Sequence, residues 1–215
     1  MKPTNSKQNV TALATISAAG ILLPPFLVLP GKRHMSWMKQ IREEMDYELT
    51  PSGWMTKETF KIYLERQFLP KLKELHTTFP VILFFDGVSS HVSLDIARKI
   101  DIMSYQRLTF KNFFTKIWHF DLEFCLDNQI FLIRLLANTS HIIQPCDVSL
   151  FASLKNKWQQ ASADFKPPTN MGNFPSRLLS VWKQMTESVV RSGFRASGIF
   201  PFNPNAVKYT CAYSL

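Results

Sequence analysis

The chain has 215 residues, of which 46% are hydrophobic and 13% aromatic, so it can fill the core of one large globular domain, and a disordered chain is excluded. Twenty-five Lys and Arg against sixteen Asp and Glu give a net charge of +9, which favours a polyanionic partner such as nucleic acid. Cys125, Cys146 and Cys211 are widely spaced and include no C-x-x-C pair, so neither a disulfide framework nor a zinc site is indicated.

The uncharged segment 11–30 has to be weighed as a membrane span, a signal peptide cut near Ala19, or a pair of strands. Its three prolines make it a poor span, because each proline removes a backbone donor. Two runs rich in Val, Ile, Leu and Thr, at 9–18 and 21–29, flank Ala19 and Gly20. This pattern predicts a hairpin of two strands that ends at residues 31–33.

A linker and a helix are predicted next. The linker covers residues 43–53. Thr56 is predicted to cap a helix that runs through Phe68, because apolar residues recur there at helical spacing, and Pro70 is predicted to stop it.

Two continuous apolar runs, Val81–Phe85 and 130–136, predict strands with both faces covered by helices. A helix beginning over 93–98 is predicted between them, and another follows at 148–165. Pro175 is predicted to open a last helix that Gly193 closes, with Leu178, Trp182, Met185 and Val189 on one face. This order predicts an α/β fold with a mixed sheet.

Two aspartates stand where a metal site would be built. Asp86 directly follows the first strand, where open α/β sheets bind ligands, and Asp147 follows Pro145 at a predicted helix start. Two divalent ions held about 3.5–4 Å apart by such carboxylates would clamp the attacking and leaving oxygens of a phosphodiester displacement. The residues alone leave structural roles open, as an Asp-Gly turn for Asp86 and a helix N-cap for Asp147.

Several motifs resemble the DDE superfamily endonuclease domain of pogo, Tigger and jerky-type transposases. They are DGVSSH at 86–91, NTSHIIQPCDVSLF at 138–151 and SGFRASGIFPFNP at 192–204, and segments 9–32 and 52–60 resemble further parts in the same order. The resemblance implies a ribonuclease H-like mixed sheet flanked by helices and two-metal DNA cleavage and transfer with Mg²⁺. It also implies three acidic metal ligands, of which Asp86 matches the second and Asp147 the third.

The first acid of the family lies on a first strand upstream of residue 9, and residues 1–8 contain no acid. The nearest carboxylates, Glu43, Glu44 and Asp46, are expected in a solvated linker. We therefore expect residues 1–204 to form a partial DDE endonuclease domain that lacks its first strand and catalysis, with a tail at 205–215. Loss of this strand, central in the implied fold, is expected to expose two strand edges.

Six further residues are candidates with two interpretations each. His91 and His141 are possible site-lining residues or donors of structural hydrogen bonds. Lys32, Arg33, Lys155 and Lys157 are possible phosphate contacts or ordinary solvated side chains.

The resemblance also implies a nuclear protein, and no membrane span is expected. The upstream helix-turn-helix region of such proteins is absent from the chain, so DNA binding is expected to be weak and independent of sequence. Two alternatives stay open. One is an active metal-dependent endonuclease or transposase whose missing acid is supplied elsewhere, and the other is a domesticated nuclear interaction protein.

The stretch between Asp86 and Asp147 is longer than the resemblance leads us to expect. Segment 99–123 is rich in Lys, Ile and Phe and lacks Gly, Pro and Ala. We predict that it is an insertion translated from a retained intron. The alternative is a genuine helical insertion with an apolar face that includes Ile102 and Phe113.

Overall fold

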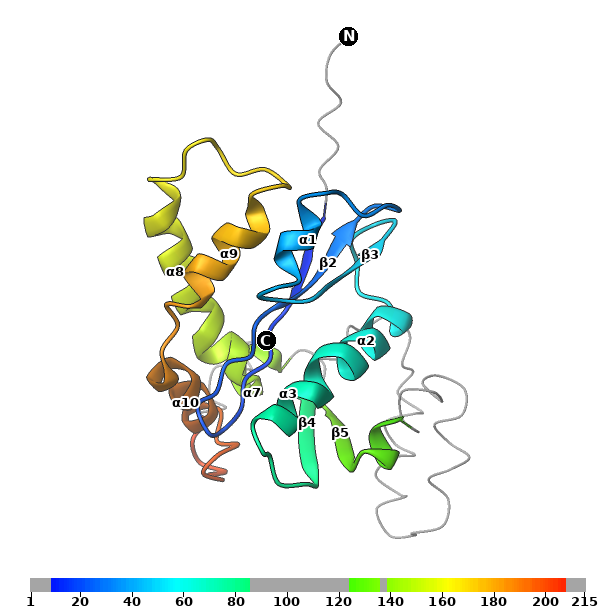
Figure 1. Ribbon diagram of the computed structural model, residues 1–215. Helices are drawn as coiled ribbons and strands as arrows, with labels where there is room; N and C mark the ends of the chain where they lie inside the picture. The colour runs from blue at the N-terminus through cyan, green and yellow to red at the C-terminus, as the bar shows by residue number, and fades with distance from the viewer. Residues whose placement is uncertain (1–8, 86–123, 136–138, 208–215) are drawn as a thin grey trace, which may run out of the picture. The chain divides into compact units, whose positions relative to one another are not determined.

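The computed structural model describes residues 9–85, 124–135 and 139–207 (Figure 1). The chain divides into two compact units, one of Met1–His76 with His141–Leu215 and one of Thr77–Ser140. Small sheets flanked by helices make the fold α/β, as predicted, and the arrangement is consistent with a ribonuclease H-like fold. The predicted helix over 93–98 and the predicted insertion at 99–123 lie outside the described residues.

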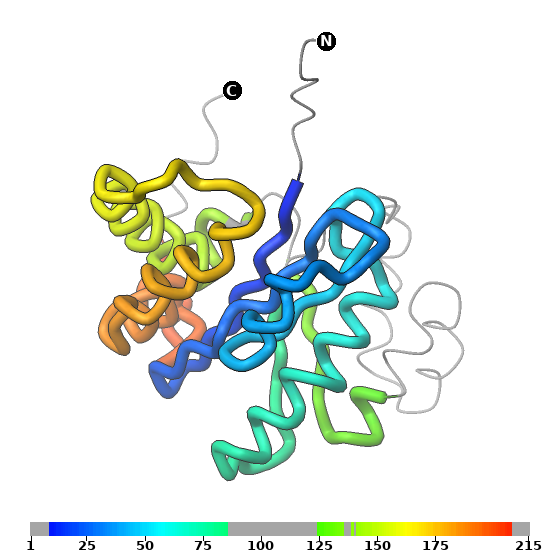
Figure 2. The backbone as a smooth tube through the Cα atoms, turned by 45° about the horizontal axis from the view of Figure 1, so that its top comes forward, coloured from blue at the N-terminus to red at the C-terminus, as the bar shows by residue number. Residues whose placement is uncertain are grey.

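The first unit opens with the predicted hairpin, which is confirmed. β1 (Thr11–Leu13) pairs antiparallel with β2 (Phe26–Pro30), and the bridge between Ile16 and Leu22 continues the hairpin toward its turn. Gly20 in that turn has φ +90°, a conformation that favours glycine. In Figures 1 and 2 the hairpin runs beside α9 (Phe174–Trp182) and α10 (Glu187–Ala196).

A third strand lies where a linker is predicted, and that prediction is wrong. After α1 (Met38–Ile41), β3 (Tyr47–Thr50) pairs parallel with β2. The linker carboxylates are partnered as well: Arg66 donates to both Asp46 and Glu48. A strand of four residues with a glutamate inside has little local signal, because its stability comes from pairing with β2 and from burial of Tyr47.

The predicted helix cap is confirmed, but the predicted stop is wrong. Thr56 caps α2 (Lys57–Tyr63), with its hydroxyl accepting from the Thr59 N–H at 3.3 Å. The chain then continues through the π-helical η1 (Leu64–Phe68) into α3 (Leu69–Glu74), with Pro70 in its first turn. The wide turn restarts the helix at Leu69, and a proline is tolerated at a helix start because no donor is needed there.

The second unit contains the two predicted apolar strands. β4 (Val81–Phe85) and β5 (Ile130–Arg134) pair in parallel, with Val81 opposite Ile130. Their side chains are not covered on both faces, because Ile82 is 54% and Phe131 48% exposed. A continuous apolar run therefore does not distinguish a strand covered on both faces from one covered on a single face. Among the described strands, β4 pairs only with β5 and β1 only with β2.

Helices of the first unit cover its sheet. The predicted helix over 148–165 corresponds to the π-helical η3 (Cys146–Leu150) and α8 (Phe151–Ser162), whereas the predicted last helix is two helices, α9 and α10. The chain leaves the helix after Trp182, and extended Thr186 precedes α10. The predicted apolar face is kept across this break, and its four residues contact one core that includes Leu27, Leu29, Tyr47, Cys146 and Leu150.

Gly193 lies inside α10 rather than at its end, so the prediction that it closes the last helix is wrong. A Cβ at this position would lie 2.5 Å from the Pro145 carbonyl oxygen. The glycine therefore permits a close approach between helices instead of terminating one.

Candidate functional site around Asp147

Asp147 lies in the first turn of η3, which follows the short α7 (Ser140–Ile143). Its position at a helix start agrees with the sequence analysis, but the N-cap is Pro145, so the N-cap interpretation is wrong. Pro145 itself has helical dihedrals, φ −55° and ψ −33°, and proline suits the start of a helix. The neighbours Cys146 and Leu150 are buried, which ties the turn that carries the carboxylate to the core.

The turn around Asp147 is held by α10. The Ser149 hydroxyl lies 2.7 Å from the Val189 carbonyl oxygen, to which it donates, and 2.9 Å from the Ser192 hydroxyl. Gly193, one residue on, brings α10 against the Pro145 carbonyl. The motifs at 138–151 and 192–204 thus meet in space. The sequence analysis identified both motifs and missed their contact, because no local pattern links positions so far apart.

The thiol beside Asp147 is buried and favours its protonated form. Cys146 is 8% exposed, and its burial, with a contribution from the negative charge of Asp147, raises the pKa of the thiol to about 12. Since the thiolate is the form that binds metal or attacks an electrophile, this raised pKa disfavours both roles for Cys146 near neutral pH. Its role in this turn is to fill the core.

The other predicted site residues of the first unit are spread over three elements. His141 is exposed on α7, and Lys155 and Lys157 lie on α8. Lys32 and Arg33 are exposed in the loop after β2. Asp86 and His91 lie outside the described residues, so their predicted roles beside Asp147 stay predictions.

Whether a divalent cation can bind near Asp147 depends on how many ligand side chains the protein brings together there. DDE endonuclease domains use divalent metal ions. Within the described ranges, no three His, Cys, Asp or Glu side chains come together as a group that could hold one. The described residues around Asp147 therefore do not form a Mg²⁺ site by themselves.

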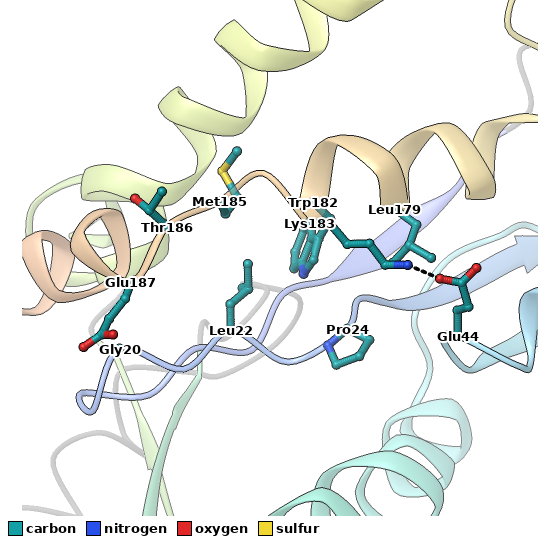
Figure 3. Close-up of a pocket in the computed structure, with 10 residues that line it drawn as sticks. All are labelled: Gly20, Leu22, Pro24, Glu44, Leu179, Trp182, Lys183, Met185, Thr186 and Glu187. Carbon is teal, nitrogen blue, oxygen red and sulfur yellow. Dashed lines mark hydrogen bonds and ion pairs between the residues drawn. The ribbon is translucent and has the colours of Figure 1, made fainter.

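A separate pocket of about 290 Å³ lies between the hairpin turn and the connection from α9 to α10 (Figure 3). Its wall is largely apolar, and the indole N–H of Trp182 donates to the Leu23 carbonyl at 2.9 Å. An ion pair between Lys183 and Glu44 stands at one end, and Glu187 stands beside Gly20 at the other. Glu187 is itself paired with Arg191 one turn along α10, so of these two ion pairs the one between Lys183 and Glu44 joins separate segments of the wall.

Comparison with known proteins supports the resemblance in the first half of the chain. No helix among the described residues is long and apolar enough to cross a membrane. Over 214 residues the chain is 25% identical to a Cochliobolus lunatus protein named MFS-type transporter clz9, covering 96% of this chain and 20% of that protein. The chain thus spans about a fifth of the length of this relative. No solved structure matches the chain. Residues 7–110, which include Asp86, match the family model of the DDE superfamily endonuclease.

Proposed function

We propose that this chain is a nucleic-acid-binding protein derived from a transposase of the pogo, Tigger and jerky type, that it acts in the nucleus, and that it does not cleave DNA. The observation that carries the proposal is the match of residues 7–110 to the DDE superfamily endonuclease, which supports a function related to nucleic acid. The net charge of +9 supports the same class of partner, because it attracts phosphate.

The proposed binding is weak and independent of sequence. Four cations, Lys32, Arg33, Lys155 and Lys157, form no ion pair with any residue that the structure describes. Such side chains attract backbone phosphates, which carry no sequence information. Phosphate contacts of this kind account for affinity but not for recognition of a target sequence.

The proposed lack of cleavage rests on the metal ligands. An active member of the family is expected to use three acids, and Asp86 and Asp147 are the two that match. Around Asp147 the described residues add no group of three ligands. A metal held by too few ligands is poorly positioned for in-line attack, and displacement of a reacting group by about 1 Å costs on the order of a hundredfold in rate.

Fluorescence anisotropy with a labelled DNA duplex and a scrambled duplex tests the binding. We expect the affinity to fall steeply between about 50 and 200 mM salt, with no preference for either duplex. The double variant Lys155→Ala, Lys157→Ala should weaken binding and flatten the salt dependence, whereas Lys71→Ala removes a cation already paired with Glu74 and serves as the matched control. Absence of binding at low salt, or a preference above tenfold for one duplex, contradicts the proposal.

A further inference from the structure

Phe202 is 82% exposed, more than any other large hydrophobic side chain that the structure describes, and Phe200 is 54% exposed. Both belong to the segment that follows α10, which we call the C-terminal turn and define as residues 197–207 (Figure 1). Exposed apolar surface of this kind marks a contact site when neighbouring residues present it together.

The C-terminal turn has an ordered backbone. The Asn203 N–H donates to the Gly198 carbonyl at 2.9 Å, and the Phe200 N–H donates to the Phe194 carbonyl of α10 at 3.3 Å. Gly198 has φ +71°, and a Cβ there would lie 2.4 Å from the Asn203 carbonyl oxygen, so glycine is required. The backbone that carries the two phenyl rings is therefore ordered, and binding a ligand to the rings costs the protein little backbone entropy.

The charge of the segment that includes this turn favours an anionic partner. Arg195 in the last turn of α10 is exposed and forms no ion pair with a described residue. Glu187 is the one acidic residue in segment 187–207, and it is paired with Arg191. Exposed aromatic rings together with basic side chains are the combination that binds single-stranded nucleic acid through base stacking and phosphate contacts.

We propose that Phe202 and Phe200 form a stacking site for unpaired nucleic-acid bases, with Arg195 contacting the adjoining phosphate. This inference rests on the proposed function, since it assigns a second contact surface to the same class of partner. It also adds a preference for single-stranded over double-stranded nucleic acid, which phosphate attraction alone does not produce. Unpaired bases can stack on the rings, whereas the bases of an intact duplex are already stacked on one another.

The test uses fluorescence anisotropy of the full chain with a labelled oligodeoxythymidine and with a labelled duplex. Phe202→Ala is expected to weaken single-strand binding by about fivefold or more, with duplex affinity and salt dependence unchanged. Phe202→Leu keeps an apolar side chain without a ring and should behave like Phe202→Ala, while Phe202→Trp should retain wild-type affinity. Because Phe202 is so exposed, none of these changes should alter the melting temperature.

The outcomes separate the two proposals. If the wild type binds neither DNA at about 50 mM salt, the proposed function fails. If the wild type binds both and Phe202→Ala binds equally well, the stacking site is wrong while the function stands. Full affinity in Phe202→Leu also overturns the stacking site. If light scattering shows that Phe202→Ala changes the oligomeric state, the turn is instead a contact between copies of the chain, and the proposal is again overturned.

Discussion

Gly193 of α10 and Pro145 at the start of η3 approach so closely that a methyl group on the glycine would lie 2.5 Å from the Pro145 carbonyl oxygen and 3.2 Å from Cβ of Ser149. Neither obstacle is the end of a long side chain, so neither can swing aside. Gly193→Ala must therefore push α10 away from the turn that carries Asp147. We expect it to lower the free energy of unfolding by about 1–3 kcal/mol. Urea denaturation followed by circular dichroism measures the change.

Gly172→Ala is the matched control. Gly172 is exposed, and the nearest atom to a Cβ there is Oδ1 of Asn170 at 3.4 Å, an ordinary contact. The control should change the free energy of unfolding by about 0.5 kcal/mol at most. If Gly193→Ala is as stable as the control, the close packing of α10 on η3 is wrong.

Gly193 also shows why some features are predictable from sequence and others are not. A glycine after a periodic apolar stretch often follows a helix end, so the local pattern favours termination there. Gly193 in fact contacts Pro145, which is remote in sequence, so the residues around Gly193 carry no pattern that predicts the contact. The hairpin around Gly20 is predictable because its turn signal and both strands are neighbours in sequence.

The same contrast between local sequence patterns and long-range contacts applies to the candidate site. The position of Asp147 at a helix start can be predicted from Pro145 beside it, whereas the hydrogen bond between Ser149 and Ser192 cannot, because it joins two distant motifs. β3 was not predicted for a related reason, because Tyr47–Thr50 is stabilised by pairing with β2 rather than by its own composition. Local signals thus predict most single elements, and contacts between elements come only from the structure.

Stability should fall at alkaline pH because of Cys146. Burial raises the pKa of this thiol from 9.0 to about 12, so the folded state holds the proton more tightly than the unfolded state. The stabilisation is therefore complete below pH 9 and is lost as the pH rises toward 12, by at most about 1.4 kcal/mol per pH unit. Burial also raises the pKa of Tyr63 from 10.0, so its contribution falls away above pH 10.

Urea denaturation between about pH 8 and 11 tests this pH dependence. Cys146→Ala should reduce the loss of unfolding free energy above pH 9, even if it lowers that free energy at pH 8. Leu154→Ala shortens a side chain packed against the same core without removing a titratable group, so it should lower stability equally at every pH. An identical slope in Cys146→Ala and the wild type would show that the thiol does not titrate as described.

We expect no nicking of supercoiled plasmid in Mg²⁺ or Mn²⁺, because two matched acids, Asp86 and Asp147, stand where three ligands are expected. Gel electrophoresis of the plasmid measures the reaction, with Asp86→Ala and Asp147→Ala as controls. A contaminating nuclease would leave activity in both variants. Turnover that disappears in both shows instead that the chain is an active nuclease.

The segment 99–123 is predicted to be absent from mature transcripts. Arg98 and Lys99 can be encoded with a GT splice donor, and residues 120–123 can be encoded by a T-rich tract that ends in an acceptor AG. Removing the segment in frame would join the residues after Asp86 to those before β5 as one short helix, and it would remove no predicted catalytic group. A protein without 99–123 should therefore keep the wild-type melting temperature.

Transcript sequencing across this junction decides the question. If every mature message contains these codons, the segment is folded protein, and the deletion should instead lower the melting temperature.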